Sequence, residues 1–308
     1  MSSFNSFDET LSAQFSDKGV TLELAPFVVR IYTDIPSVLA GLQLYYSEYP
    51  VPGSSAFADF HVSLRRPRSA YRWFRPQVSF EFDGTVPFKP LPYEQAYPMF
   101  EWGLNWCIAN HCHRFLMIHA AVVEREGCAA ILAAPPGSGK STLCAALVSR
   151  GWRLLSDELA LIDPATLRIA PIPRPIGLKN DSIEIIRHFN PSAVIGPVVK
   201  DTRKGTVTHM KAPVGSILRS RETACPAWVI FPRYERDAAV RLRPHSKART
   251  VVRLAENSFN YTLLGAIGFD ALIGIVDQAE CYEFTYSKLD DAISIFADLK
   301  APPLCQAR

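Results

Sequence analysis

The sequence predicts an α/β protein, and three features of the chain support this fold class. The apolar run 129–132 is followed by a glycine-rich turn and by the apolar run 143–148, the order expected of strand, loop and helix. Several short segments within residues 20–88 alternate apolar and polar side chains with a period of two, as half-buried strands do. From residue 115 onward, the pattern becomes strand, loop, helix and strand. We therefore expect a small β-rich α+β unit followed by a larger core in which helices flank a sheet.

The chain is expected to divide into three parts. Residues 1–92 form a β-rich N-terminal domain, residues 93–114 a connecting helix, and residues 115–308 the larger domain. The proline-rich joint 87–92 marks the first boundary. With 308 residues, of which 48% are hydrophobic, the chain has enough apolar material for a substantial core.

Composition narrows the class of protein. A net charge of +3 is too small to indicate nucleic-acid binding. No signal peptide is expected, because the first residues have neither a basic start nor an apolar stretch. The longest apolar candidate for a membrane span, 263–276, is interrupted by Asp270. The seven cysteines form no CxxC pair, so we expect reduced thiols in a cytoplasmic protein, with homo-oligomerisation left open.

Within the N-terminal domain, strands are expected near 20–24, 29–31, 60–64 and 78–82, with a turn at Asp83-Gly84 and a helix over 37–45. In the larger domain, the expected strands are 116–123, 128–133, 152–158 and 227–231. Helices are expected over 182–189, 250–264 and 287–299, the last with Ser287 and Asp290 at capping-box spacing. The basic segment 200–211 is expected to be a mobile loop.

Two clusters invite functional interpretations that we disfavour. Residues 65–75 combine five arginines with three aromatic residues, a mixture that could bind an acidic peptide or a nucleic-acid backbone. A solvated surface loop explains the same composition. Cys107, His111, Cys112 and His113 could suggest a metal, but their spacing resembles no common zinc pattern.

The glycine-rich segment 133–142 carries the clearest chemical signal. In a strand–turn–helix context, its backbone N–H groups and the helix N-terminus can surround phosphate, and Lys140 can reach the outer phosphates. Ser141 would hold Mg²⁺ through its hydroxyl group. Ala134 replaces the first glycine of the usual pattern, and a chance turn before a buried helix is the alternative. The expected nucleotide-binding residues are Pro136, Gly137, Ser138, Gly139, Lys140, Ser141 and Thr142.

Two acidic residues, Asp157 and Glu158, end the strand that follows the expected loop helix. Adjacent strand residues point to opposite faces, so one carboxylate can hold the metal with Ser141 and the other can act as a general base. Acids that merely end a surface strand would give the same pattern. In an open, parallel-type sheet the end of this strand lies beside the phosphates, so Asp157 and Glu158 can divide these two roles.

With these motifs in place, the chain resembles the HPr kinase/phosphorylase family, and more closely the group called HprK-related kinase A. The resemblance covers nearly the whole chain. The segments that carry it are 57–62, 102–107, 118–120, 137–141, 150–158, 173–180, 204–211 and 255–261.

The resemblance implies a P-loop kinase core of the HPr kinase type, with a mixed sheet and flanking helices. It also implies dependence on ATP and Mg²⁺ and transfer of phosphate to a serine of a small carrier protein. In that family, the histidine ahead of the loop is an active-site residue, which here is His119. The family's general base is an aspartate that corresponds to Glu158, and a later active-site arginine corresponds to Arg243. Thr142 stands where the parent family has a glutamate.

Four further cations, Arg174, Lys179, Lys204 and Lys211, are candidates for contact with the γ-phosphate or an acidic substrate. Solvated surface cations would need no such role. The leading hypothesis is a serine-directed kinase for a small protein or peptide. The alternatives are a small-molecule kinase and an ATP-binding adaptor in a peptide-modification system.

Overall fold

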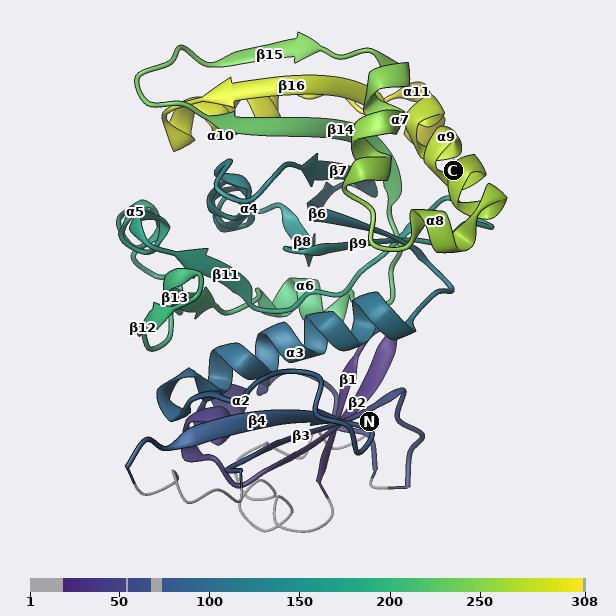
Figure 1. Ribbon diagram of the computed structural model, residues 1–308. Coiled ribbons are helices and arrows are strands. Elements are labelled where there is room, and N and C mark those ends of the chain that lie inside the picture. The colour runs from purple at the N-terminus through teal and green to yellow at the C-terminus, as the bar shows by residue number, and fades with distance from the viewer. Residues whose placement is uncertain (1–18, 54, 68–73, 307–308) are drawn as a thin grey trace, which may run out of the picture.

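A computed structural model describes residues 19–53, 55–67 and 74–306 of the chain (Figure 1). The middle of the basic and aromatic segment 65–75, residues 68–73, lies outside the described residues. The structure is a mixed α/β protein with several sheets and helices, as the sequence predicts.

The N-terminal part of the chain forms one sheet with strand order β1-β2-β3-β4-β5. Its strands are β1 (Val20–Leu24), β2 (Phe27–Thr33), β3 (Phe60–Arg65), β4 (Gln77–Phe82) and β5 (Leu91–Pro92). The β2 and β3 strands are parallel, and helix α2 (Pro36–Tyr46) makes the crossover between them. The alternating burial of β2 and β4 gives the sheet one apolar face, which confirms the period of two seen in the sequence.

Helix α3 (Ala96–His111) lies between the N-terminal sheet and the rest of the molecule, after the short 3-10 helix η2 (Tyr93–Gln95) (Figure 1). Phe100, Leu104 and Ile108 are fully buried and follow one another at helical spacing. Gly103 allows close approach to β4, because a Cβ atom there would lie 2.3 Å from the Phe80 ring. The helix is therefore shared by both parts of the molecule.

The larger part of the chain contains a mixed sheet with strand order β10-β9-β6-β7-β14-β16-β15, in which β8 also pairs with β6. Strands β7, β14 and β16 are parallel, whereas β6 is antiparallel to β7, β8 and β9. The strands are β6 (Leu116–Arg125), β7 (Cys128–Ala133), β8 (Arg153–Ser156), β9 (Leu159–Ile162), β10 (Ile169–Ala170), β14 (Cys225–Tyr234), β15 (Arg241–Pro244) and β16 (Glu280–Tyr286).

Helices cover both faces of this sheet. Ile118 and Val122 of β6 pack into the core beneath α7 (Lys247–Glu256) and α9 (Ala266–Gln278). Met117 and Val123 belong to the opposite core, which contains α4 (Lys140–Ser149) and α10 (Leu289–Ala297). The period of two in β6 thus places His119 on the α4 side of the sheet.

A small second sheet with strand order β11-β13-β12 lies beside α4 (Figure 1). Its strands are β11 (Ile176–Lys179), β12 (Val199–Thr202) and β13 (Gly205–Met210), and helix α5 (Asp181–Phe189) follows β11. The expectation of a mobile loop at 200–211 is wrong, because this segment forms the β12–β13 hairpin. Val207 and Met210 are buried and pair with β11, which outweighs the basic composition of the turn.

Two local helix predictions also need correction. The expected helix 250–264 is interrupted after α7, and α8 (Tyr261–Leu264) is separate. Asn260 explains the break, since its side chain donates to Phe115 O (2.8 Å) and accepts from Met117 N (2.9 Å). The capping box at Ser287 does not form: the Ser287 hydroxyl donates to Ala238 O (2.8 Å), and Lys288 holds the N-cap position.

The prediction that all thiols are reduced is wrong for one pair. Cys225 and Cys305 form a disulfide that joins β14 to the C-terminal helix α11 (Pro303–Gln306), with their Cα atoms 5.9 Å apart. The pair is separated by 80 residues, so no local cysteine spacing could have revealed it. The other five cysteines are free and buried.

No group of three or more His, Cys, Asp or Glu side chains suited to a metal is found among the described residues. At the candidate cluster on α3, Cys107 is buried in the core and His111 packs against Phe82 and Trp106. Over the same part of the chain, no helix combines the length and apolar character needed to cross a membrane.

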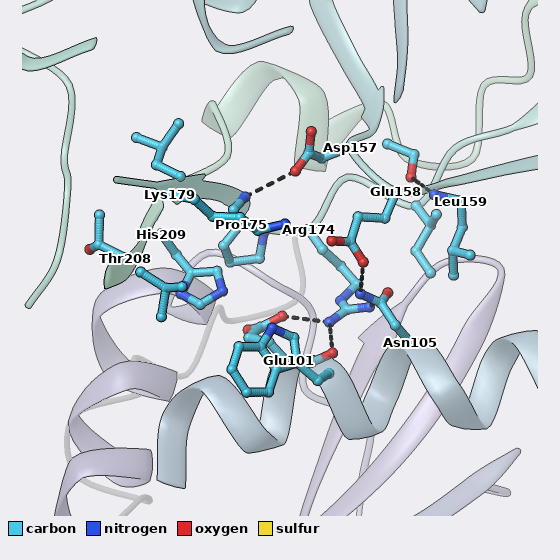
Figure 2. Close-up of a pocket in the computed structure, with 16 residues that line it drawn as sticks. Glu101, Asn105, Asp157, Glu158, Leu159, Arg174, Pro175, Lys179, Thr208 and His209 are labelled. Atoms are coloured by element: carbon cyan, nitrogen blue, oxygen red, sulfur yellow. Dashed lines mark hydrogen bonds and ion pairs between the residues drawn. The ribbon is translucent and has the colours of Figure 1, made fainter. Parts of the chain in front are cut away.

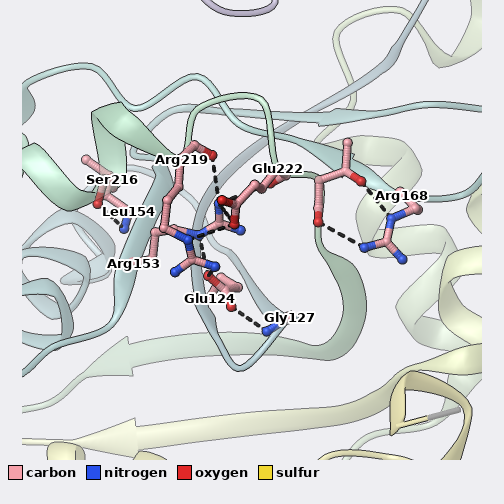
Figure 3. A network of polar contacts seen from close by, with 9 residues as sticks. Glu124, Gly127, Arg153, Leu154, Arg168, Ser216, Arg219 and Glu222 are labelled. Carbon is pink, nitrogen blue, oxygen red and sulfur yellow. Dashed lines mark hydrogen bonds and ion pairs between the residues drawn. The ribbon is translucent and has the colours of Figure 1, made fainter. Parts of the chain in front are cut away.

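A buried ion pair holds together the ends of β6 and β8 (Figure 3). The side chains of Glu124 and Arg153 are only 1% and 5% exposed and are bonded to each other. Glu124 also accepts from Gly127 N, while Arg153 donates to the carbonyl oxygens of Arg219 (2.9 Å) and Glu222 (3.0 Å). This network fixes the β6–β7 hairpin against β8.

Candidate active site

The turn between β7 and α4 depends on two glycines with left-handed backbone conformations. Gly137 and Gly139 have φ angles of +86° and +87°. A Cβ atom on Gly139 would lie 2.4 Å from Tyr286 Oη and 2.9 Å from Tyr234 Cβ. Both φ and space therefore require glycine at position 139.

The ends of two parallel strands hold this turn in place. Tyr234, the last residue of β14, donates its N–H to Ser138 O (2.8 Å). Tyr286, the last residue of β16, donates its hydroxyl to Gly139 O (2.9 Å). The carboxyl ends of β7, β14 and β16 thus meet at the turn, as expected where parallel strands bind a ligand.

Lys140 begins α4 directly after the turn. The residue is only 7% exposed, and its Nζ finds no hydrogen-bond partner among the described residues. Burial lowers the pKa of Lys140, while the charges of Asp157 and Glu158 oppose this change. A buried ammonium group without a partner is costly, so this position favours an anionic ligand.

Asp157 lies in the bend between β8 and β9 and is 6% exposed. Its Oδ2 accepts from Gly177 N (3.0 Å), but no described residue gives its Oδ1 a partner. Burial and the nearby Glu158 raise the pKa of Asp157 to about 6, against opposing effects of Lys140, the Gly177 N–H and the Ser141 hydroxyl. Asp157 is therefore near the Ser141 hydroxyl group, and carboxylate and hydroxyl oxygens are both suitable ligands for Mg²⁺.

Glu158 follows in the same bend but turns toward α3 (Figure 2). Its Oε2 accepts a hydrogen bond from Asn105 Nδ2 (2.6 Å), and the residue remains partly exposed. Burial raises the pKa of Glu158, but nearby positive charges outweigh this effect and leave the pKa below its usual value. The responsible groups are Lys204, Lys179 and Lys140, and His119 acts in the same direction only when it is protonated. Glu158 is thus ionised at neutral pH and partly accessible.

His119 lies on β6, opposite Leu159 of β9, and its backbone N–H donates to Asn257 O (2.8 Å). Its ring contacts Phe259 with centroids 5.8 Å apart. Burial and the charge of Lys140 lower the pKa of His119 to about 4, although Glu158 acts in the opposite direction. The imidazole is therefore neutral at neutral pH.

A cleft beside the two carboxylates is lined by residues of α3, the β8–β9 bend, β11 and β13 (Figure 2). Lys179 of β11 lines it, and Lys204 lies near it in the β12–β13 turn, where its Nζ is 5.0 Å from the centroid of the Trp102 ring. The charges of both lysines act on Glu158 and His119. The two cations can therefore compensate negative charge at this position.

Two of the other candidate cations already have ionic partners. Arg174 lines the cleft, but its guanidinium group is bonded to the Glu101 carboxylate and to Asn105 Oδ1. Lys211 forms an ion pair with Glu48 (2.8 Å) beside a different cleft. Arg174 therefore forms part of the wall of the cleft, whereas Lys211 lies away from this cleft.

Arg243 is not brought to the turn. The residue is exposed on the edge strand β15, opposite Glu283 of β16. Strands β14 and β16 lie between β15 and β7, so three inter-strand spacings separate them, about 14 Å. Thr142 is partly exposed in the first turn of α4.

Sequence reasoning did not single out Asn105 and Glu101, which connect α3 to the cleft. Asn105 lies within the segment 102–107 that contributes to the family resemblance, so a signal was present. Tyr234 and Tyr286 were also missed, because strand ends 95 and 147 residues beyond Gly139 cannot be assigned to a turn without the fold.

The comparisons with known proteins concern part of the chain. Residues 104–174 match the model of the family described as "SynChlorMet cassette protein ScmC", a segment that includes His119, Lys140, Asp157 and Glu158. None of the curated proteins compared with the chain matches it. Among solved structures, the HPr(Ser) kinase/phosphatase from Coxiella burnetii is similar at 10% sequence identity and a TM-score of 0.24. That match covers 59% of this chain and 95% of the other.

Proposed function

We propose that this protein is an ATP- and Mg²⁺-dependent kinase that transfers the γ-phosphoryl group to a hydroxyl group, a serine, of a small protein or peptide. One observation carries the proposal. Lys140 Nζ and Asp157 Oδ1 are buried beside a glycine-rich turn, and neither has a hydrogen-bond partner within the described residues. Opposite charges left unpaired in this way are suited to a phosphate and its metal ion.

The turn supports the phosphate assignment independently of Lys140. Gly137 and Gly139 have the left-handed conformations typical of turns whose N–H groups form an anion-binding concavity. The N-terminus of α4, which spans ten residues, adds positive potential at the same place. The buried Ser138 hydroxyl also finds no partner in the described part of the chain.

Ser141 and Asp157 are the residues that would hold Mg²⁺. Ser141 lies in the first turn of α4, its hydroxyl group influences Asp157, and Oδ1 of Asp157 has no partner among the described residues. When bound, the ion would neutralise charge on the phosphate oxygens. The pKa of Asp157, raised to about 6, leaves the carboxylate mostly ionised at neutral pH and able to act as a ligand.

Glu158 is assigned as the general base. It is ionised, partly exposed and next to the cleft, so it can accept the proton of an acceptor hydroxyl group. The acceptor oxygen forms a bond to the γ-phosphorus, and the bond from that phosphorus to the β,γ-bridging oxygen breaks. The electron pair of the broken bond leaves with ADP, and the proton stays on Glu158.

The remaining residues near the cleft tune its charge. Lys179 and Lys204 compensate the negative charge of the transferred group. His119 is neutral at neutral pH, so its ring can donate or accept one hydrogen bond beside Lys140 without adding charge. The preference for a protein or peptide acceptor rests on the family resemblance of the sequence.

Labelled ATP tests the proposal. The purified chain is incubated with Mg²⁺, γ-labelled ATP and an extract of the cells that encode it, and the products are separated by size. Label on a polypeptide, with its phosphate on serine, is the expected result. Label on a metabolite would instead indicate a small-molecule kinase.

Two controls complete the experiment. Glu158→Gln should lose transfer and retain ATP binding in calorimetry, because the side chain acts on the acceptor rather than on the nucleotide. Binding of ATP without any transfer by the unaltered chain would favour the adaptor reading. Absence of ATP binding would overturn the kinase and adaptor readings together.

A further inference from the structure

Asn105 of α3 lies between two charged groups of the cleft wall. Its Nδ2 donates to Glu158 Oε2 (2.6 Å), and its Oδ1 accepts from Arg174. Only this orientation of the amide satisfies both neighbours, since the reverse would set an oxygen against the carboxylate and an NH₂ group against the guanidinium. The Asn105 side chain therefore links the position of the Glu158 carboxylate to that of the Arg174 guanidinium group.

Arg174 is itself anchored to the connecting helix. Its guanidinium group is bonded to the Glu101 carboxylate and donates to Glu101 O (3.0 Å). Glu101 is 3% exposed and lies one helical turn before Asn105. One face of α3 thus holds Arg174 at two points (Figure 2).

The anchor continues into the N-terminal sheet unit. The hydroxyl groups of Tyr46, at the end of α2, and Tyr97 donate to Glu101 Oε1 at 2.8 and 2.6 Å. Tyr49 donates to Pro173 O, directly before Arg174. These contacts are buried, so the network is well shielded from water and rigid.

We propose that Asn105 is a positioning residue that holds Glu158 toward the acceptor cleft, and that the N-terminal part of the chain thereby completes the catalytic site. This inference rests on the proposed role of Glu158 as base. Glu158 lies in a short bend with one side-chain hydrogen bond, from Asn105, among the described contacts. Without that bond, the carboxylate would be free to leave the position from which it reaches the acceptor hydroxyl group.

The substitution Asn105→Asp separates positioning from simple packing. Aspartate has the same size and keeps an oxygen toward Arg174, so it preserves the anchor. It replaces the donor facing Glu158 with a second acceptor, which repels the carboxylate. We expect phosphate release from saturating Mg·ATP, with water as acceptor, to fall about 100-fold while the ATP dissociation constant stays unchanged.

Asn110→Asp is the matched control, because Asn110 is on the same helix, is exposed, and donates to Trp106 O (2.9 Å). That variant should turn over like the unaltered chain. A fully active Asn105→Asp variant would overturn the inference, as would a parallel loss of ATP affinity and thermal stability. Recovery of at least part of the rate in Asn105→Gln, which retains the amide donor, is also expected.

A spectroscopic measurement tests the contact without relying on activity. In the ¹⁵N-asparagine-labelled chain, the Asn105 side-chain amide should show a downfield, slowly exchanging proton that shifts in Glu158→Gln. The Asn110 amide should not respond. An unchanged Asn105 resonance would overturn the positioning role even if the chain is a kinase. If the unaltered chain neither hydrolyses ATP nor transfers its phosphate to a polypeptide of the cell extract, the proposed function itself fails, which is distinct from a loss confined to Asn105→Asp.

Discussion

Two buried charge clusters lie at opposite ends of β6 and β8, and they differ in how completely they are paired. At one end, Glu124 and Arg153 bond to each other and to backbone groups (Figure 3). At the other end, Lys140 and Asp157 are buried to a similar degree but retain atoms without partners in the described structure. Both clusters border the same sheet and are similarly buried, so burial alone does not distinguish them.

The difference in pairing separates a structural cluster from a functional one. A buried ion pair whose hydrogen bonds are complete holds elements together. A buried charge whose bonds are incomplete reduces stability until a ligand supplies the missing partner. The Glu124–Arg153 pair therefore holds the sheet together, whereas in the proposed function Lys140 and Asp157 bind a phosphate group and its cation.

The largest expected effect is on phosphate transfer at the incompletely paired end. Lys140→Ala should reduce transfer by about 10³-fold or more, because the side chain supplies positive charge to the β/γ-phosphates. Folding should persist, because Lys140 Nζ makes no hydrogen bond within the described structure. Transfer of labelled phosphate measures the activity, and circular dichroism shows whether the variant is folded. Transfer at the unaltered rate would remove the turn from the mechanism.

The next effect is on stability, at the paired end. Glu124→Ala leaves Arg153 buried without its carboxylate and should lower the free energy of unfolding by about 3–5 kcal/mol. Glu222→Ala removes a partner whose side chain is 56% exposed, so its effect should stay below about 1 kcal/mol. Urea denaturation measures both variants. If Glu124→Ala alters ATP affinity as strongly as stability, the two clusters are not separable.

Asp157→Asn should raise the free energy of unfolding, whereas Glu124→Ala should lower it. The carboxyl pKa rises from 3.8 to about 6 on folding, so the folded state binds the proton more tightly and loses stability as pH rises through this window. Two pKa units correspond to about 3 kcal/mol, which the variant should regain near pH 7 in metal-free buffer. The gain should shrink as pH falls through about 6 and nearly vanish at pH 4.

Denaturation of Asp157→Asn at several pH values measures this gain. Asp277→Asn serves as the control, because the Asp277 side chain is 76% exposed and its replacement should change little at any pH. A gain that does not depend on pH would show that the buried charge is not its source. The variant should also lose Mg²⁺-dependent transfer, which is the expected opposition between stability and function.

The sequence predicted those parts of the fold that depend on local pattern. Period-two alternation identified β1 to β4, the strand–loop–helix–strand pattern identified β6, and the glycine-rich turn identified the start of α4. The pattern failed where distant residues decide. The β12–β13 hairpin at 200–211 is stabilised by pairing with β11, and Cys225 meets Cys305 across 80 residues.

For the site, motif spacing correctly grouped the residues that are close in sequence to the glycine-rich turn. Lys140 and Glu158 affect the pKa values of both His119 and Asp157, and the Ser141 hydroxyl group also acts on Asp157. Isolated lysine and arginine residues could not be assigned to the site from the sequence, because whether a lysine faces a cleft or an ion-pair partner depends on tertiary packing. The role of the polar face of α3 could not be predicted from the sequence for the same reason, because it depends on contact with Arg174 in the folded protein.

The smallest expected effects concern two of the candidate cations, Lys211 and Lys179. Lys211 forms an ion pair with Glu48 beside a different cleft, whereas the charge of Lys179 acts on Glu158 and His119. Lys211→Ala should therefore leave phosphate transfer unchanged and lower the free energy of unfolding by less than about 1 kcal/mol. Lys179→Ala should slow transfer about tenfold or more at unchanged stability.

Parallel measurement of transfer and urea denaturation distinguishes the two lysines. A loss of transfer in Lys211→Ala would mean that the second cleft takes part in substrate binding. Equal activity of both variants would mean that positive charge around Glu158 is not needed for transfer. If Lys179→Ala alone is slow, the position of a cation relative to the unpaired cluster, rather than its exposure, decides whether it contributes to catalysis.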